Sequence, residues 1–163
     1  MLNDYRLYFS LPYDVDVTDT LAQFLQASRE NVLQSIGGAW YRMDVVAPVG
    51  DRARRRQWFG SGAPLQVLIG LSPSSVLVAA PQFQWEDTHA LTLKAGHVTG
   101  SYDRVQGVDV ETLSKSVREA EELRRAMFGY CRYCRGFTGP EQGWSREEPT
   151  CYSCMERYLG FVF

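Results

Sequence analysis

The stretch CRYCRGFTGPEQGWSREEPTCYSC, residues 131–154, decides how the C-terminal part of this chain folds. It holds all four cysteines of the chain as two CxxC pairs, Cys131/Cys134 and Cys151/Cys154, with sixteen residues between the pairs. Two residues between thiols let one tight turn direct both sulfurs to a common point, and two such turns supply the four thiolates that tetrahedral Zn²⁺ prefers. The spacing therefore predicts one structural zinc ion bound by these four cysteines.

Two other uses of the thiols stay open. Disulfides would suit a secreted chain, but the N-terminal residues MLNDYR carry charges where a signal segment needs apolar residues. A rubredoxin-like iron site or a redox dithiol would use the same pairs, yet Arg135 and Met155 stand where rubredoxin-like turns usually have glycine. Zinc is the expected cofactor, and four thiolate ligands leave no position on the metal for a catalytic water.

The segment from Tyr130 to Phe163 resembles the broad group of CxxC…CxxC zinc ribbons and treble-clef fingers. The resemblance rests on the four thiols, so it implies a metal scaffold and no particular activity. A short helix is expected from Met155 to Gly160, with Thr150 as its N-cap, and this favours the treble clef over the ribbon. The finger of DnaK-suppressor-type transcription factors is similar in spacing, but the β-rich first 105 residues have no place in that family.

Residues 1–128 predict an α+β domain that is large enough to fold without a metal. Strands are expected at residues 5–11, 39–47, 65–71, 75–85, 89–95 and 98–105, with a turn at Gly96–His97 between the last two. Helices are expected from Asp16 or Thr18 to Ile36 and from Asp109 to Phe128. The second helix has an apolar stripe that should face the sheet: Leu113, Val117, Ala120, Leu123 and Met127.

This order predicts an antiparallel sheet of about six strands with two helices on one face (β-α-β5-α), followed by the zinc finger. Two parts are expected, an α+β domain at 1–128 and a zinc module at 129–163. The step from Phe128 to Cys131 is so short that the module should be rigidly attached. The sequence does not indicate an oligomeric state.

Composition narrows the classes of partner. A net charge of −2 and a pI near 5.7 disfavour a chain that wraps nucleic acid or coats an anionic membrane through bulk charge. No apolar run is long enough to cross a bilayer, and reduced paired thiols suit a reducing compartment, so a cytoplasmic protein with no membrane contact is expected.

The zinc module is rich in aromatic residues. A small metal domain cannot enclose all of them, so several must pack on the neighbouring domain, the more common outcome, or face a partner. The residues expected to form such a contact surface are Tyr133, Phe137, Trp144 and Tyr152. Positive and negative charges in the module nearly cancel, which suits a protein partner better than nucleic acid.

One basic run suggests an alternative. The residues Arg52, Arg54, Arg55 and Arg56 precede Trp58 and Phe59 in what reads as a connection between two strands. Arginines can hold phosphates while aromatic rings stack on bases, which would give a single-stranded nucleic-acid or nucleotide site. The structural alternative is a solvated loop, or an edge strand whose charges keep other strand edges away.

Catalysis has little support in the sequence. Only His89 and His97 could act as bases near neutral pH, but His89 falls on the apolar side of its expected strand, as a residue at the edge of the core does, and His97 falls in the expected turn. We therefore expect that the chain is not an enzyme. We expect a zinc-containing binding or adaptor protein that acts through a protein partner. Besides nucleic-acid binding, a second alternative is a small-ligand carrier with a pocket between the sheet and the final helix, because the element order resembles the helix-grip arrangement.

Overall fold

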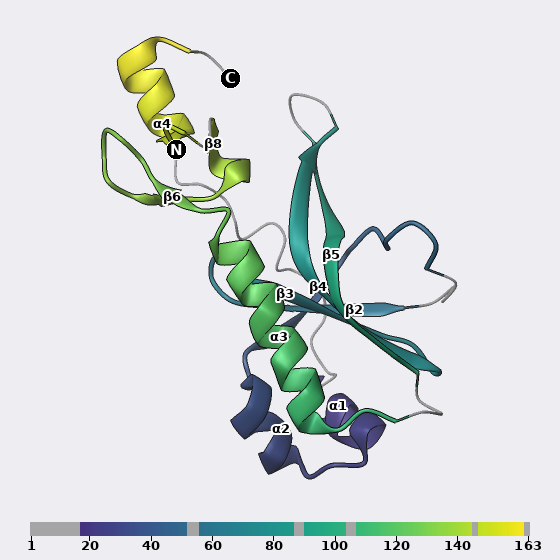
Figure 1. Cartoon of the computed structure of the whole chain (residues 1–163). Coiled ribbons are helices and arrows are strands. Elements are labelled where there is room, and N and C mark those ends of the chain that lie inside the picture. The colour runs from purple at the N-terminus through teal and green to yellow at the C-terminus, as the bar shows by residue number, and fades with distance from the viewer. Residues whose placement is uncertain (1–16, 52–55, 87–89, 104–106, 145–146, 162–163) are drawn as a thin grey trace.

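The computed structural model describes residues 17–51, 56–86, 90–103, 107–144 and 147–161, and it shows an α+β protein (Figure 1). A five-stranded antiparallel sheet, in the order β1-β2-β3-β4-β5, is covered by helices and followed by the cysteine-containing module. Its elements are α1 (Val17–Leu25), α2 (Arg29–Ile36), β1 (Trp40–Met43), β2 (Gln57–Ser61), β3 (Val67–Leu71), β4 (Ser75–Trp85), β5 (Leu91–Asp103) and α3 (Val110–Arg125). The module adds two short hairpins, β6 (Gly129–Tyr130) with β7 (Phe137–Thr138) and β8 (Gly143–Trp144) with β9 (Thr150–Cys151), then α4 (Tyr152–Cys154).

Two hydrophobic clusters lie on opposite faces of the sheet. The first fills the space between the sheet and α1, α2 and α3, and α3 lies across β3, β4 and β5 (Figure 1). The second lies on the other face and includes Met43, Trp58, Leu68, Leu77 and Leu93. Because β3 contributes to both clusters, all its residues are buried, and this explains why its sequence is apolar without alternation.

The sheet is curled: β1 and β5 are its two edge strands, yet the chain just after β1 contacts β5. Val46 forms a parallel bridge with Lys94 of β5. Its N–H donates to the carbonyl of Leu93 (2.9 Å), and its carbonyl accepts from the N–H of Ala95 (3.1 Å). The expected strand 39–47 is thus shorter than predicted, since only Trp40–Met43 pair with β2. The expected strand at 5–11 lies outside the described residues.

The single helix predicted from residue 16 or 18 to 36 is wrong, because two helices occupy this range. Gln26 takes a left-handed conformation (φ 51°) that ends α1. Ser28 then caps α2, with its Oγ accepting from the N–H of Asn31 (3.2 Å). Thr18 lies inside α1 rather than at its cap, and Asp16 lies outside the described residues.

The predicted turn at Gly96–His97 is also wrong. Strand β5 runs unbroken through both residues, which together oppose the single residue Ala80 of β4 in a β-bulge. A Cβ at Gly96 would lie 2.9 Å from the Cβ of Gln82, so glycine permits this close approach. The bulge also accommodates Pro81, which has no N–H for the sheet.

Strand β2 was missed, because residues 57–61 were assigned to a connection. Trp58 belongs to the second hydrophobic cluster and Phe59 to the first, so the two rings face opposite sides of the sheet. A strand buried on both faces shows no alternation, and the neighbouring arginines and glycines made it resemble a loop.

Helix α3 begins as predicted, with Asp109 accepting from the N–H of Thr112 (2.7 Å). Its expected apolar stripe is only partly correct. Leu113, Val117 and Ala120 are buried, but Leu123 is exposed and the fully buried position in the last turn belongs to Arg124.

A buried ion pair fixes the start of β2. The Arg56 side chain is 4% exposed and Asp51 is 5% exposed, and their two contacts measure 2.8 and 2.9 Å. The guanidinium also donates to the carbonyls of Gly70 (3.0 Å) and Ser75 (3.3 Å). Arg56 therefore ties β2 to the turn between β3 and β4, and it is no solvated loop residue.

Replacing Arg56 by alanine should lower the free energy of unfolding by about 3–5 kcal/mol, because it removes both buried contacts of the guanidinium with Asp51 and its bonds to the carbonyls of Gly70 and Ser75. The matched control is Arg125→Ala, which removes an exposed helical pair with Glu121 and should cost less than about 0.5 kcal/mol. Urea denaturation of the three proteins measures both values. Equal effects of the two replacements would contradict a buried role for Arg56.

Candidate metal centre

The first cysteine pair lies in the turn of the β6–β7 hairpin. The N–H of Cys131 donates to the carbonyl of Gly136 (2.8 Å), and the N–H of Arg135 donates to the carbonyl of Cys131 (2.9 Å). Arg135 has a left-handed conformation (φ 61°), the region that glycine occupies most easily. The turn therefore folds back on itself and points both thiols of the pair to one side.

The second pair lies where β9 passes into α4. Cys151 is the last residue of β9, and Cys154 lies in the single turn of α4, which continues into a π-helical turn, Met155–Leu159. Gly160 ends this helix with a left-handed conformation (φ 69°), as predicted. Thr150, the predicted N-cap, belongs to β9, and the capping position is taken by Cys151.

The four sulfur atoms lie within 4.8 Å of one another, and the Sγ atoms of Cys134 and Cys151 are 3.8 Å apart. A tetrahedral centre with metal–sulfur bonds of about 2.3 Å places its sulfurs about 3.8 Å apart. The cysteines predicted from spacing alone are thus brought together in an arrangement that could hold a metal ion. Cys131 and Cys154 are buried, whereas Cys134 is exposed.

The surroundings of Cys131 and Cys154 shift the pKa values of these two thiols in opposite directions. Burial alone would raise the pKa of Cys131, but the N–H groups of Cys134, Cys151 and Tyr133 directed at its sulfur lower this pKa to about 6. Burial, together with contacts to the other thiols, raises the pKa of Cys154 to about 12. A metal ligand must be a thiolate, so the surrounding N–H groups favour this state at Cys131, whereas Cys154 reaches it more easily when a metal's positive charge is present.

A second buried ion pair joins the module to the sheet domain. Arg124 of α3 contacts Glu141 of the module through its Nη2 atom and the Oε1 atom of the carboxylate, and both side chains are almost fully buried. The Arg124 Nε–H donates to the carbonyl of Leu65 (3.1 Å). The guanidinium lies 5.4 Å from the ring centre of Phe83 and 4.6 Å from that of Phe128. Neither Arg124 nor Glu141 was singled out from the sequence.

The aromatic residues of the module take several positions. Tyr133 stacks on Tyr158 with their ring centres 4.9 Å apart. Tyr152 contacts Trp85 of β4 edge-on, with ring centres 6.4 Å apart. Phe137 stacks on Phe128 with ring centres 4.7 Å apart, and the centre of its ring lies 5.5 Å from that of Tyr130. Trp144 belongs to β8, and its side chain is not among those described. The expectation that such rings pack on the neighbouring domain holds for Tyr152, but Tyr130, Phe137 and Tyr158 remain 65%, 47% and 56% exposed.

Of the basic run and its aromatic neighbours, the structure describes Arg56, Trp58 and Phe59, and these three residues do not form an exposed surface. Trp58 and Phe59 are buried in β2, so neither ring is placed to stack on a base. Arg56 is committed to Asp51, and its guanidinium lies 6.0 Å from the ring centre of Trp58. Arg52, Arg54 and Arg55 lie outside the described residues.

The remaining candidate sites are also placed differently from expectation. His97 lies on β5 and is exposed, whereas His89 lies outside the described residues. The space between α3 and the sheet, where the helix-grip comparison placed a ligand, is filled by buried side chains that include Leu113, Val117 and Ile69.

Comparison of the chain with known proteins finds no matching protein-family model, no matching curated protein and no matching solved structure. Across the described ranges, no helix has both the length and the apolar composition needed to cross a membrane.

Replacing Glu141 by leucine should lower the free energy of unfolding by about 3–5 kcal/mol, because it leaves the buried Arg124 charge without a counterion. The double replacement Arg124→Met/Glu141→Leu removes both charges and should recover part of this loss. A double-mutant cycle, completed with Arg124→Met and measured by urea denaturation, gives the coupling. Strictly additive effects would show that the pair does not join the two parts.

Proposed function

We propose that this chain is a non-catalytic adaptor whose zinc-bound, treble-clef-like module presents exposed aromatic rings to a protein partner. Three features support zinc in a finger of this kind. One cysteine pair lies in a hairpin turn and the other at the start of a helix, and the sulfur spacing fits four thiolates around one ion. Met155 continues the helix, whereas a rubredoxin-like centre would have a second tight turn at this point.

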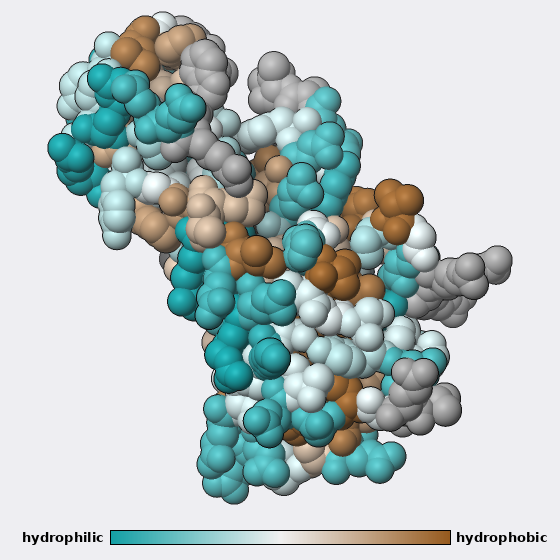
Figure 2. Space-filling view, in the orientation of Figure 1, coloured by the Kyte–Doolittle hydropathy of each residue, from teal (hydrophilic) through white to brown (hydrophobic). Residues whose placement is uncertain are grey.

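The observation that carries the proposal is the set of large rings exposed on the module. We call Phe128, Tyr130 and Phe137, which contact one another at the β6–β7 hairpin, the hairpin aromatic face. Tyr130 and Phe137 are exposed although the sheet domain adjoins the hairpin. Contiguous exposed aromatic residues on a fixed support are typical of protein-binding surfaces. Figure 2 shows hydrophobic residues interrupting the hydrophilic surface where the module meets the sheet domain.

The charge of the module supports a protein partner over nucleic acid. Arg132 pairs with Glu148, and Arg157 lies on the same helical turn as Glu156. Glu141 is buried in its ion pair with Arg124 and does not contribute charge to the module surface. A surface with balanced charges gives little of the salt-dependent attraction that dominates binding to phosphates.

The purified protein should contain one zinc ion per chain, and Cys151→Ser should abolish stoichiometric binding. Elemental analysis checks the first outcome. The second should also make the module susceptible to proteolysis, because the binding free energy of structural zinc, about 10–16 kcal/mol, contributes directly to folding. Full-length protein with no zinc and four freely titratable thiols under native conditions would contradict the zinc assignment.

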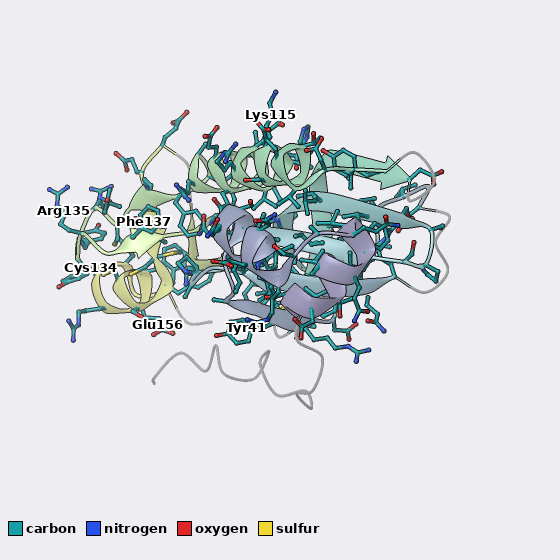
Figure 3. The ribbon with its side chains drawn as sticks, turned by 90° about the horizontal axis from the view of Figure 1, so that it is seen from below. Tyr41, Lys115, Cys134, Arg135, Phe137 and Glu156 are labelled. Carbon is teal, nitrogen blue, oxygen red and sulfur yellow. The ribbon has the colours of Figure 1, made fainter. Side chains whose placement is uncertain are left out.

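The partner can be sought with a photo-crosslinking residue in place of Tyr130. The matched position is Lys115, which is exposed on the outward side of α3 (Figure 3). A partner recovered from native extract at position 130 and not at 115 is then purified, and its affinity is measured by calorimetry. Tyr130→Ser should weaken binding about thirtyfold, the effect of losing an interface residue worth about 2 kcal/mol. Val49→Ser, which changes a fully exposed residue of the sheet domain, should have no effect.

Two outcomes would overturn the adaptor proposal. One is a Tyr130→Ser variant that binds the purified partner as tightly as the unchanged protein does. The other is tight binding of a single-stranded oligonucleotide that falls steeply with salt concentration, because phosphate contacts produce that dependence and a neutral aromatic surface does not.

A further inference from the structure

An apolar pocket lies between the curled sheet and the module. It has a volume of about 290 Å³ and lies on the sheet face opposite to α3. Met43, Leu65, Phe83 and Leu91 contribute to its walls from the sheet domain, and Phe137 and Glu141 contribute from the module. The helix-grip comparison placed a ligand on the other face, so the pocket is a separate feature.

Glu141 gives this apolar pocket one polar group with an unused hydrogen-bonding atom. Its Oε1 atom contacts Arg124, whereas its Oε2 atom is buried and accepts no hydrogen bond from any residue that the structure describes. The Nη1 atom of Arg124 is also buried and donates no hydrogen bond to any residue that the structure describes. A buried carboxylate oxygen without a donor costs free energy, so a donor supplied from the pocket would be favoured. The last torsion of a glutamate side chain is broad, which lets the carboxylate turn its second oxygen toward the pocket.

The position of Phe137 connects the pocket to the surface proposed for the partner. This ring lines the pocket and also belongs to the hairpin aromatic face through its contacts with Phe128 and Tyr130. A partner that covers the hairpin aromatic face therefore contacts a ring that also lines the pocket. Pockets for drug-sized molecules measure about 300–1,000 Å³, so this pocket lies just below that range and suits a single large side chain.

We propose that the pocket receives one anchoring side chain of the protein partner, an aromatic ring with an N–H or O–H donor, which bonds to Glu141. Tryptophan and tyrosine have this combination, and both are enriched among the residues that dominate binding energies at interfaces. The proposal rests on the adaptor function and specifies its binding mode. The ring packs against Phe83 and Leu91, and its donor satisfies the second carboxylate oxygen of Glu141.

The first test uses indole and 1-methylindole as probes of the unchanged, zinc-loaded protein. The two molecules share a ring system, but only indole has an N–H donor. Methyl NMR signals of Leu65 and Leu91 should shift when indole is added, whereas those of the exposed Leu123 should not. Indole should bind about fivefold more tightly than 1-methylindole, the effect of one net hydrogen bond. No shift up to the solubility limit of indole, or equal affinities, would overturn the proposal.

The second test fills the pocket. Leu91→Trp places a larger side chain in the pocket wall, and Leu123→Trp makes the same change at the exposed position on α3. Leu91→Trp should abolish the indole shifts and weaken binding of the purified partner about tenfold or more, whereas Leu123→Trp should change neither. The smaller replacement Leu91→Phe serves if the tryptophan variant does not fold.

The outcomes separate the two proposals. If Leu91→Trp blocks indole but leaves partner affinity unchanged while Tyr130→Ser weakens it, the adaptor function stands and the anchor proposal is overturned in favour of a free small-molecule site. If Tyr130→Ser does not weaken partner binding, the adaptor function fails, and the anchor proposal fails with it.

Discussion

Arg124 and Glu141 form an ion pair from which water is excluded, and the relation between the two parts of the chain depends on it. The guanidinium leaves the last turn of α3, contacts the carboxylate of the module and donates to the carbonyl of Leu65. It is also flanked by the rings of Phe83 and Phe128. Two buried charges must stay together, because separating them leaves each in a medium that solvates it poorly. The position of the module relative to the sheet is thereby restricted to those arrangements that keep the pair intact.

The same pair lies beside the proposed binding surface, and one of its members, Glu141, belongs to the module that has the candidate metal centre. The four cysteines that could hold a metal lie in the hairpin turn and at the start of α4, whereas the hairpin aromatic face and the pocket lie nearer the sheet. Glu141 contacts α3 and also lines the pocket. In the proposed function the metal would keep the hairpin folded, and the ion pair would hold that hairpin next to the pocket. Neither task involves chemistry at the metal.

The sequence predicted those features that depend on local spacing. The cysteine pairs, the Asp109 cap of α3 and the glycine that ends the last helix follow from short-range rules, and the structure has each of them. The antiparallel α+β architecture followed from the alternation of strand-like and helix-like segments.

Features that depend on tertiary contacts were missed. Leu25 and Val32 fit one helical period, so the spacing of apolar residues did not reveal the break at Gln26 between them. Trp58 and Phe59 face two different cores, which removed the alternation that would have revealed β2. Arg124 was not singled out, because a charged residue in a helix usually is exposed and its partner lies seventeen residues further along the chain. A buried charge can be recognised only together with the residue that neutralises it.

The bridge formed by Val46 has a consequence for the behaviour of this protein at high concentration. A long strand at the border of a sheet offers unpaired N–H and C=O groups to strands of other molecules, and such contacts lead to cross-β aggregation. Val46 uses the outward backbone groups of Leu93 and Ala95 on β5, and the side chain of Lys94 between them is held by Gln84 at 2.7 Å. A charged residue and an intramolecular bridge thus occupy the section of β5 nearest the pocket, so this section of the sheet edge offers fewer unpaired backbone groups to a second molecule.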